Sequence, residues 1–531
     1  MKALRLLGIL CIMLFSVVDR SFCYEVSTHE EITKNALEKA LQVRNFLADI
    51  GYTKDDRITF TFTTYDPYGD LSGNNGTFTN SIIEWMKYGS NVEDNTISET
   101  LFRYRNHFYD PVYNRGYQYG VLTGEKAPDW ALEDNGSYSL QYWSIPHAKS
   151  YYLAALTSST KTERDNNLAK TFKALGHVIH TVEDMAQPQH TRNDSHGTGS
   201  QYEKQLVTYP PSNYAPSYMP SFSSYRGFYF TGDGKGLAEF SNRSFVTEGT
   251  NFNCTNLDLS NPSSTCLNAY YSNPVLSVYL KEEVQIADLL TELGMSNDNN
   301  LSGVVTFFGN QITDAYSGQT FENNRMTTYS IFDKDLINKG AAPTFTLNKA
   351  NYNKMAEYLI PRAVGYSAGL LNYFFRGQME IICTPAGLKV KNIGNEIMAS
   401  YFDQNSGHSV TIYYDDNKTP SQRIMLAEYI LDTPLNPGDV TNEITFSKPT
   451  DNIESGRYIV VFRGKLGAEE GAVIGMIKEP KEIYYASKRN GIYKIYKIDG
   501  IGSCEEKETV VYGASCKTPN TSTLNLFRAT Q

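Results

Sequence analysis

Between Gly176 and Glu203 the chain carries four of its eight histidines, with carboxylates interleaved. Imidazole nitrogen and carboxylate oxygen, without cysteine, form the usual ligand set of catalytic rather than structural zinc. His180 and Asp184 are four residues apart, so on a helix they project from one face, one turn from each other. A lone histidine on a helix is usually packed or solvated, but a cluster with this spacing favours a metal centre.

The residues after this pair continue the pattern on a different backbone. Pro188 is predicted to end the helix. His177, three residues before His180, fits either a bystander or a hydrogen-bonding partner of a ligand. The candidate ligands on the looser, glycine-rich segment after Pro188 are His190, His196 and Glu203.

Three distant segments offer the same donor atoms. His29 lies close to a predicted processing site, in the sequence Tyr24-Glu-Val-Ser-Thr-His29. An acidic pair follows at Glu93 and Asp94, and the segment 107–111 reads His-Phe-Tyr-Asp-Pro. These segments become relevant only if folding brings them to the central cluster.

The first 23 residues are predicted to be a secretory signal peptide, because two basic residues precede an apolar run over 6–18. Small residues before the expected cleavage site place Tyr24 at the new N-terminus. Acylation of Cys23 in a lipoprotein is the less favoured alternative, because the charged Asp19 stands where such a signal is apolar. The expected location is secreted or periplasmic.

Length and composition narrow the class of protein. A chain of 531 residues predicts two domains rather than one core. A content of 40% hydrophobic and 20% charged residues suits a soluble globular protein, and the net charge of −10 disfavours binding to polyanions. After the signal, no apolar run is long enough to form a transmembrane segment.

The pattern of apolar residues divides the chain near residue 379. Residues 24–378 are predicted to be mostly helical with long loops, and residues 379–531 to form an all-β sandwich. The segment 209–236, rich in Pro, Tyr and Phe, fits an ordered surface loop, a cleft wall or a lipid-facing surface. The predicted helices cover 30–47, 145–156, 168–185, 275–293 and 352–375. The predicted strands cover 387–393, 397–402, 410–414, 422–429, 442–446, 457–463, 483–486 and 491–498.

Five cysteines follow the signal peptide. Cys254 and Cys266 are twelve apart, as are Cys504 and Cys516, whereas Cys383 stands alone. In an oxidising compartment the two local pairs are plausible disulfides, although other pairings are compatible with the sequence.

On these motifs the chain resembles the bacterial zinc-dependent phospholipases C, and more distantly the single-strand-specific zinc nucleases that share their helical fold. The segment 107–111 matches the family's H-F-Y-D-P, and 180–190 matches H-x-x-x-D-x-x-Q-P-x-H. Weaker similarities lie at Tyr202-Glu203, 146–149 and 362–366. The resemblance covers about residues 24–378 and implies a phospholipase C/zinc nuclease-like catalytic domain followed by the β domain.

The resemblance implies a site for three zinc ions. The residues that match the family's ligands fall into three sets. Asp94, His107, His180 and Asp184 would hold one ion; Tyr24, through its free amine and carbonyl, and His29 would hold a second and share Asp184; and His190, His196 and Glu203 would hold the third. Asp94 is also the candidate to orient the attacking water.

The implied activity is hydrolysis of phosphodiester bonds by water that paired zinc ions activate. Phospholipase C-type hydrolysis of glycerophospholipids makes a phospholipid membrane surface the expected partner. The short lead from Tyr24 to His29 is closer to the nucleases, so a nuclease acting on single-stranded nucleic acid is the alternative. A third alternative is a non-enzymatic secreted binding protein that retains the site; protein partners are not predicted.

Overall fold

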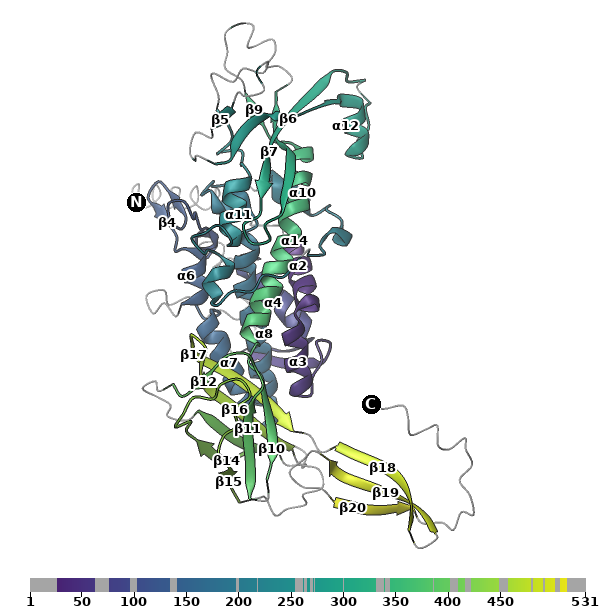
Figure 1. Cartoon of the computed structure of the whole chain (residues 1–531). Coiled ribbons are helices and arrows are strands. Elements are labelled where there is room, and N and C mark those ends of the chain that lie inside the picture. Colours follow the sequence, from purple (N-terminus) through teal and green to yellow (C-terminus); the bar gives the residue numbers. More distant parts are fainter. Residues whose placement is uncertain are drawn as a thin grey trace, which may run out of the picture. The chain divides into compact units, whose positions relative to one another are not determined.

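The computed structural model of the chain describes residues 26–62, 76–95, 103–133, 141–196, 200–216, 218–253, 261, 265–267, 271, 273–298, 300–330, 339, 344–384, 386–401, 409–415, 422–447, 457–478, 481–489, 492–501 and 507–512. These residues form two compact units (Figure 1). The first unit takes the described residues of Met1–Leu41, Thr61–Ala148 and Phe172–Tyr373. The second takes those of Gln42–Phe60, Lys149–Thr171 and Phe374–Gln531. The chain is therefore multidomain, with a helix-rich unit and a sheet-rich one.

Helices of the first unit form where apolar residues recur at helical spacing. In α2 (Val26–Lys39) the buried positions include Ile32, Ala36 and Leu37, and this face packs against α4 (Ile82–Asn95). The predicted helix over 30–47 is interrupted at Ala40, after which α3 (Leu41–Asp49) begins. The other helices with residues in this unit are η1 (Tyr104–His107), α6 (Ala127–Leu132), α7 (Ile145–Thr157), α8 (Lys161–Asp184), α9 (Pro188–Thr191), α10 (Gln201–Leu206), η2 (Pro211–Asn213), η3 (Tyr225–Phe228), α11 (Leu237–Ser244), α12 (Ile286–Glu292) and α14 (Lys349–Phe374).

The first unit also contains sheets, which the prediction of a mostly helical region with long loops did not include. Five antiparallel strands lie in sequence order: β5 (Thr265–Leu267), β6 (Val275–Gln285), β7 (Val304–Thr313), β8 (Thr320–Tyr329) and β9 (Phe345–Thr346). The strands β2 (Gly76–Ser81), β3 (Gln118–Tyr119) and β4 (Leu122–Thr123) complete the list.

The predicted helix over 275–293 is wrong for its first half. This half is strand β6, and only the second half is helical, as α12. Leu276 and Val278 are buried in a cluster with Phe308 and Met326 of the neighbouring strands, so burial repeats every second residue. Pairing with β7 decided the conformation of a segment whose apolar residues suit either period.

The second unit contains a β-sandwich, as the sequence predicts. One sheet has the order β10 (Met379–Cys383), β11 (Gly387–Asn392) and β15 (Ile444–Thr445). The other has the order β12 (Met398–Ala399), β16 (Arg457–Leu466), β13 (Val410–Asp415) and β14 (Arg423–Tyr429), with β17 (Glu469–Lys478) paired to β16. Buried side chains of both sheets, such as Leu388 and Phe462, form one apolar core. This unit also holds most of β1 (Arg57–Phe62) and a separate antiparallel sheet of β18 (Lys481–Arg489), β19 (Ile492–Ile501) and β20 (Lys507–Tyr512).

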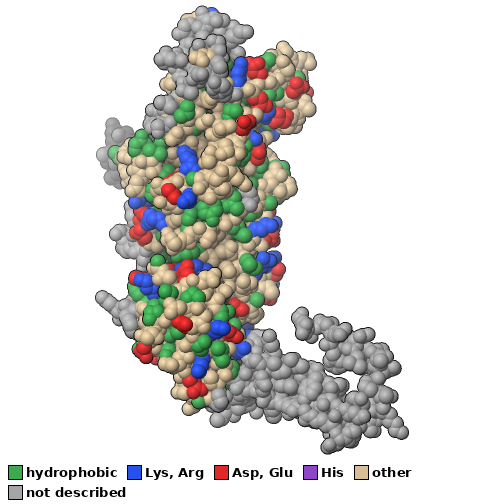
Figure 2. Space-filling view, viewed as in Figure 1, with side chains coloured by type: hydrophobic (Ala, Val, Ile, Leu, Met, Phe, Trp, Pro, Cys, Tyr) green, Lys and Arg blue, Asp and Glu red, His purple; other side chains and the backbone are tan. Residues whose placement is uncertain are grey.

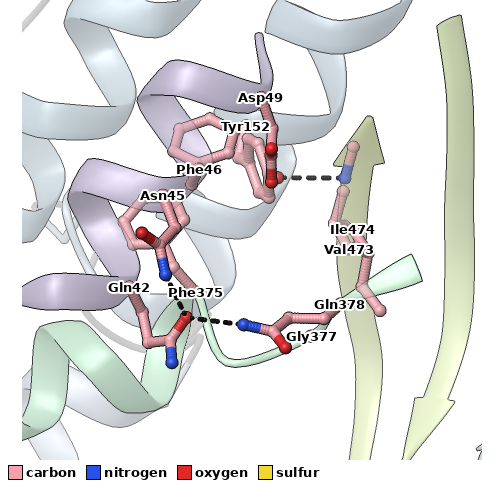
Figure 3. Close-up of a pocket in the computed structure, with 11 residues that line it drawn as sticks. Gln42, Asn45, Phe46, Asp49, Tyr152, Phe375, Gly377, Gln378, Val473 and Ile474 are labelled. Atoms are coloured by element: carbon pink, nitrogen blue, oxygen red, sulfur yellow. Dashed lines mark hydrogen bonds between the residues drawn. The ribbon is translucent and has the colours of Figure 1, made fainter. Parts of the chain in front are cut away.

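Two helical segments belong to this second unit, although the predicted boundary near residue 379 places them in the other domain. The ring of Phe46 in α3 stacks on Phe375 at 4.5 Å. The amide of Gln378 donates to Gln42 at 3.1 Å, and the hydroxyl of Tyr152 in α7 accepts from the backbone N–H of Gly475 at 3.1 Å (Figure 3). These contacts join α3 and α7 to the sandwich.

The tyrosine-rich segment 209–236 packs against α14 in the first unit. Tyr366 and Tyr373 of α14 donate to the backbone carbonyls of Lys235 and Ser223, at 2.5 and 2.8 Å. A Cβ atom at Gly365 would lie 2.4 Å from the carbonyl oxygen of Tyr218, so this helix needs glycine there. The described part of the segment is therefore an ordered, hydrogen-bonded layer.

No helix among the described residues is long and apolar enough to cross a membrane. Acidic and basic side chains lie interspersed on the face drawn in Figure 2. The two cysteines among the described residues, Cys266 and Cys383, are both disulfide-bonded. Cys254, Cys504 and Cys516 lie outside the described residues, and the predicted pairings remain predictions.

Candidate metal centre

The centre of the first unit depends on a close approach of α4 and α8. A Cβ atom at Gly89 would lie 2.0 Å from the carbonyl oxygen of Lys173, and one at Gly176 would lie 2.2 Å from that of Met86. Only glycine fits at both positions. One turn after Gly89, α4 presents Glu93 and Asp94 to the histidines of α8.

Asp94 and Asp184 lie between two imidazoles at the core of the site. The Nδ1 atom of His107 lies 3.1 Å from an oxygen of Asp94 and 3.5 Å from an oxygen of Asp184. The Nε2 atom of His180 lies 3.3 and 3.4 Å from the same two carboxylates. All four side chains are buried. The expected first set of ligands is thus brought together.

His29 joins this group from the first turn of α2. Its Nε2 atom lies 3.6 Å from Asp184, and its ring stacks on His180 with centroids 3.9 Å apart. Its donor atom lies within 4.8 Å of donor atoms of Asp94 and His180. Tyr24, the other ligand expected at this end of the chain, lies outside the described residues.

His190, His196 and Glu203 form a separate group, with donor atoms within 4.8 Å of one another. The Nε2 atom of His196 lies 3.1 Å from an oxygen of Glu203. Ser200 caps α10 and forms a capping box with Glu203, which fixes that carboxylate in the first turn. His190 also lies 3.9 Å from Asp184, so this group adjoins the first.

Each imidazole in these groups has one nitrogen bound to a fixed acceptor. The Nδ1 atoms of His180, His190 and His196 lie 2.8–3.0 Å from the carbonyl oxygens of Ser90, His107 and Asp194. The Nδ1 atom of His29 and the Nε2 atom of His107 contact carboxylates instead, those of Glu183 at 2.6 Å and of Glu93 at 3.3 Å. An N–H at these atoms leaves the opposite nitrogen of each ring with its lone pair, which is the arrangement of histidines that ligate metals. These buried groups therefore have the donor atoms and orientation to bind metal ions.

Glu93 was not assigned a role from the sequence, yet it is the most connected carboxylate beside the site. It accepts a hydrogen bond from Trp130 at 3.0 Å and pairs with Arg103, His107 and His177. His177, left open as a bystander or a partner, is therefore a hydrogen-bonding partner in this network. An acidic pair in the sequence does not show which member faces which neighbour, so the signal was present but ambiguous.

Glu183 was also missed, although it precedes a predicted ligand. Its oxygens accept from Thr33 at 3.0 Å and contact His29 and, at 3.5 Å, Ser90. Helices α2, α4 and α8 thus meet at one buried carboxylate. Burial raises the pKa of Glu183 well above its ordinary value.

Burial and neighbouring charges shift the pKa values of the candidate ligands in different directions. Burial would lower the pKa of His107 and of His196, but Asp94 raises the first to about 10 and Glu203 raises the second to about 9. Burial, followed by the nearby histidines, lowers the pKa of His29 and of His190 well below the ordinary value. Burial would raise the pKa of Asp94, but His180 and His107 lower it. Without metal, protons on His107 and His196 partly neutralise the carboxylates, and cations would replace them.

Among comparisons with known proteins, those with solved structures found a likeness. No protein-family model matches the chain, and no curated protein matches it. Among solved structures, the chain is similar to an alpha toxin from Clostridium absonum, with 14% identity over 92% of this chain and 96% of that chain, and a TM-score of 0.26. At that identity and score the likeness carries no argument about function.

Proposed function

We propose that the chain is an exported zinc-dependent phosphodiester hydrolase that acts on glycerophospholipids as a phospholipase C. The observation that supports this most is the set of five imidazoles, four of them buried, each with one nitrogen at a fixed acceptor and each grouped with carboxylates that could share a metal ion. The matches at 107–111 and 180–190 support the choice of reaction.

The donor set fits zinc. The three groups contain imidazole and carboxylate donors only, which suit this borderline ion. Both oxygens of Asp94 and the Nε2 atom of His180 are buried and form no hydrogen bond with described residues. The proposed ligands are Tyr24, His29, Asp94, His107, His180, Asp184, His190, His196 and Glu203, for three ions. When bound, zinc would activate water and neutralise charge on the phosphoryl oxygens.

The chain's own residues would place the reactants. His180 and His107 hold Asp94 ionised, so its carboxylate can accept a hydrogen bond from the attacking water and orient it. Glu93 and Glu183 fix the rings of His107 and His29, which limits movement of the donor atoms during the reaction. The role proposed for Tyr24 needs its free amine, so only the processed chain would be active.

Hydrolysis by the purified, zinc-loaded mature chain tests this proposal. Phosphatidylcholine should be cleaved to diacylglycerol and phosphocholine, and Asp184→Asn should lower kcat/KM by at least about a thousandfold, because this carboxylate joins the two ion groups. A matched control is Asp129→Asn, a more exposed position in the same unit with its own ion pairs. Cleavage of single-stranded DNA with no cleavage of lipid would favour the nuclease, and unchanged rates in Asp184→Asn would contradict an enzymatic role for the site.

A further inference from the structure

The hairpin of residues 111–124, which contains β3 and β4, exposes several large apolar side chains (β4 in Figure 1). Five of the nineteen exposed large hydrophobic side chains among the described residues lie in it, so the exposure is concentrated. They are Val112, Tyr113, Tyr119, Val121 and Leu122, and Val121 is 96% exposed. We refer to residues 111–124 as the apolar hairpin.

The tip of the apolar hairpin projects away from the rest of the described chain. Gly120 has a positive φ of 59° and no neighbouring atom within 4 Å of a Cβ position. Val121 follows at the turn, and Tyr119 and Leu122 flank it. No described residue packs over this turn. A group of large apolar side chains exposed together on a soluble protein often marks an interaction site.

The apolar hairpin carries one charge, and a carboxylate just outside it balances that charge. Its sole charged residue is Arg115, whose guanidinium pairs with Asp110 at 3.1 Å and lies 4.7 Å from the ring centre of Tyr113. A neutral, apolar tip with tyrosines beside it suits the boundary between lipid headgroups and acyl chains. A stable protein interface takes roughly 20–30 residues from each partner, far more than this hairpin offers.

The apolar hairpin is fixed to the segment that carries two candidate ligands. Gln118 and Asn193 exchange two hydrogen bonds of 2.9 and 3.0 Å. The hydroxyl of Tyr117 lies 3.0 Å from that of Ser195, next to His196. Phe108, three residues before the apolar hairpin, stacks on His190 with ring centroids 4.3 Å apart. A surface that holds the hairpin would therefore hold the metal centre beside it.

We propose that the apolar hairpin inserts its tip into a phospholipid bilayer and docks the metal centre at the surface where its substrate lies. This inference rests on the proposed function for its purpose, but the docking itself does not need hydrolysis. The contact is made by Val121 and Leu122, with Tyr113 and Tyr119 at the level of the headgroups.

Binding of the zinc-loaded full chain to phosphatidylcholine vesicles tests the proposal, measured by sedimentation at 4 °C. The double substitution Val121→Asp and Leu122→Asp should lower the partition coefficient at least about tenfold, because charge is expelled from the apolar layer. Met425→Asp, at a 56% exposed position of the second unit, is the matched control and should bind as the unchanged chain does. Zinc content and circular dichroism report whether each variant folds.

A second measurement does not depend on loss of binding. Val121→Trp should show a blue shift of tryptophan fluorescence when vesicles are added, relative to the unsubstituted chain, and Met425→Trp should show none. Absence of the shift, equal vesicle binding by the double variant, or a change of oligomeric state in place of vesicle binding would overturn the proposal. Vesicle binding without lipid hydrolysis would contradict the proposed function and leave the docking surface intact.

Discussion

The groups of side chains at the centres of the two units differ in polarity. The sandwich of the second unit buries an apolar cluster that includes Leu388, Ile412, Val460 and Phe462. The metal centre of the first unit buries carboxylates and imidazoles instead: Glu93, Asp94, Glu183, Asp184, Glu203, His29, His107, His177, His180 and His190. An apolar core is stabilised by the area removed from water, so its members contribute largely one by one. A polar core is stable only when every member has a partner, so its members depend on one another.

Removal of metal should give the largest difference between the two units. An ion present at a thousandfold above its Kd stabilises the folded state by about 4 kcal/mol, and the proposed site takes more than one ion. Calorimetry of the chain before and after chelation should show a lower unfolding temperature for the first unit. Hydrogen exchange in β13 and β16 of the sandwich should stay unchanged; equal loss of protection in both units would contradict the separation.

Glu93→Gln should be the most damaging single change beside the site. It leaves Arg103 buried without its carboxylate partner, and removal of one partner from a buried pair costs about 3–5 kcal/mol. Urea denaturation measures this loss. The control is Glu133→Gln, whose side chain is 50% exposed in its pair with Arg226, and we expect a loss below about 1 kcal/mol.

Leu388→Ala should show the independence of the sandwich. Truncation of this fully buried side chain should lower the free energy of unfolding by about 2–5 kcal/mol, depending on how far the cavity collapses. Urea denaturation gives the loss, and zinc content is the second readout. We expect the zinc content to stay the same, and a fall in it would mean that the apolar core and the metal centre are coupled.

The effect of pH should be smaller and confined to the first unit. In the chain without metal, His107 has a pKa of about 10 and His196 of about 9, so both carry a proton at pH 7.5. Because these pKa values are raised, the protons stabilise the metal-free fold fully below about pH 6.5, and this contribution is lost between there and pH 9–10. Zinc must displace about two protons from these rings.

Calorimetric titration with zinc in buffers of different ionisation enthalpy counts these protons. We expect about two protons released from the imidazoles at pH 7.5, and an apparent affinity that rises towards pH 9. Zinc binding without proton release would mean that the metal does not displace the protons of His107 and His196.

The sequence predicts the sandwich well because alternation of apolar residues and turn residues is a local signal. The strands of 387–466 lie at or within a few residues of their predicted bounds, whereas β10, β17 and β20 were not predicted and β6 was predicted as a helix. Its first residues, Val275 to Leu280, read equally well as a helix face, and only pairing with β7 selects the strand. Likewise, α3 and α7 pack with the sandwich through Phe46 and Tyr152, a contact that chain order does not reveal.

The candidate ligands were accessible from the sequence because their spacing is tied to a helix and to short motifs. His180 and Asp184 share a helix face, and the histidines after Pro188 follow within one short segment. The roles of the supporting carboxylates, Glu93 and Glu183, could not be predicted from the sequence. Each lies next to a candidate ligand in the chain, and the direction of its side chain depends on how the helices pack. Contacts of this kind are set by tertiary packing.

X-ray diffraction at the zinc absorption edge, on crystals of the zinc-loaded mature chain, shows directly whether these residues bind zinc. We expect anomalous peaks within bonding distance, about 2.0–2.1 Å, of nitrogen atoms in both histidine groups. One peak should lie between His180, Asp94 and Asp184, and another between His190, His196 and Glu203. Absence of any peak at these residues, with zinc present in the crystal, would contradict the claim that this buried polar core is a metal centre.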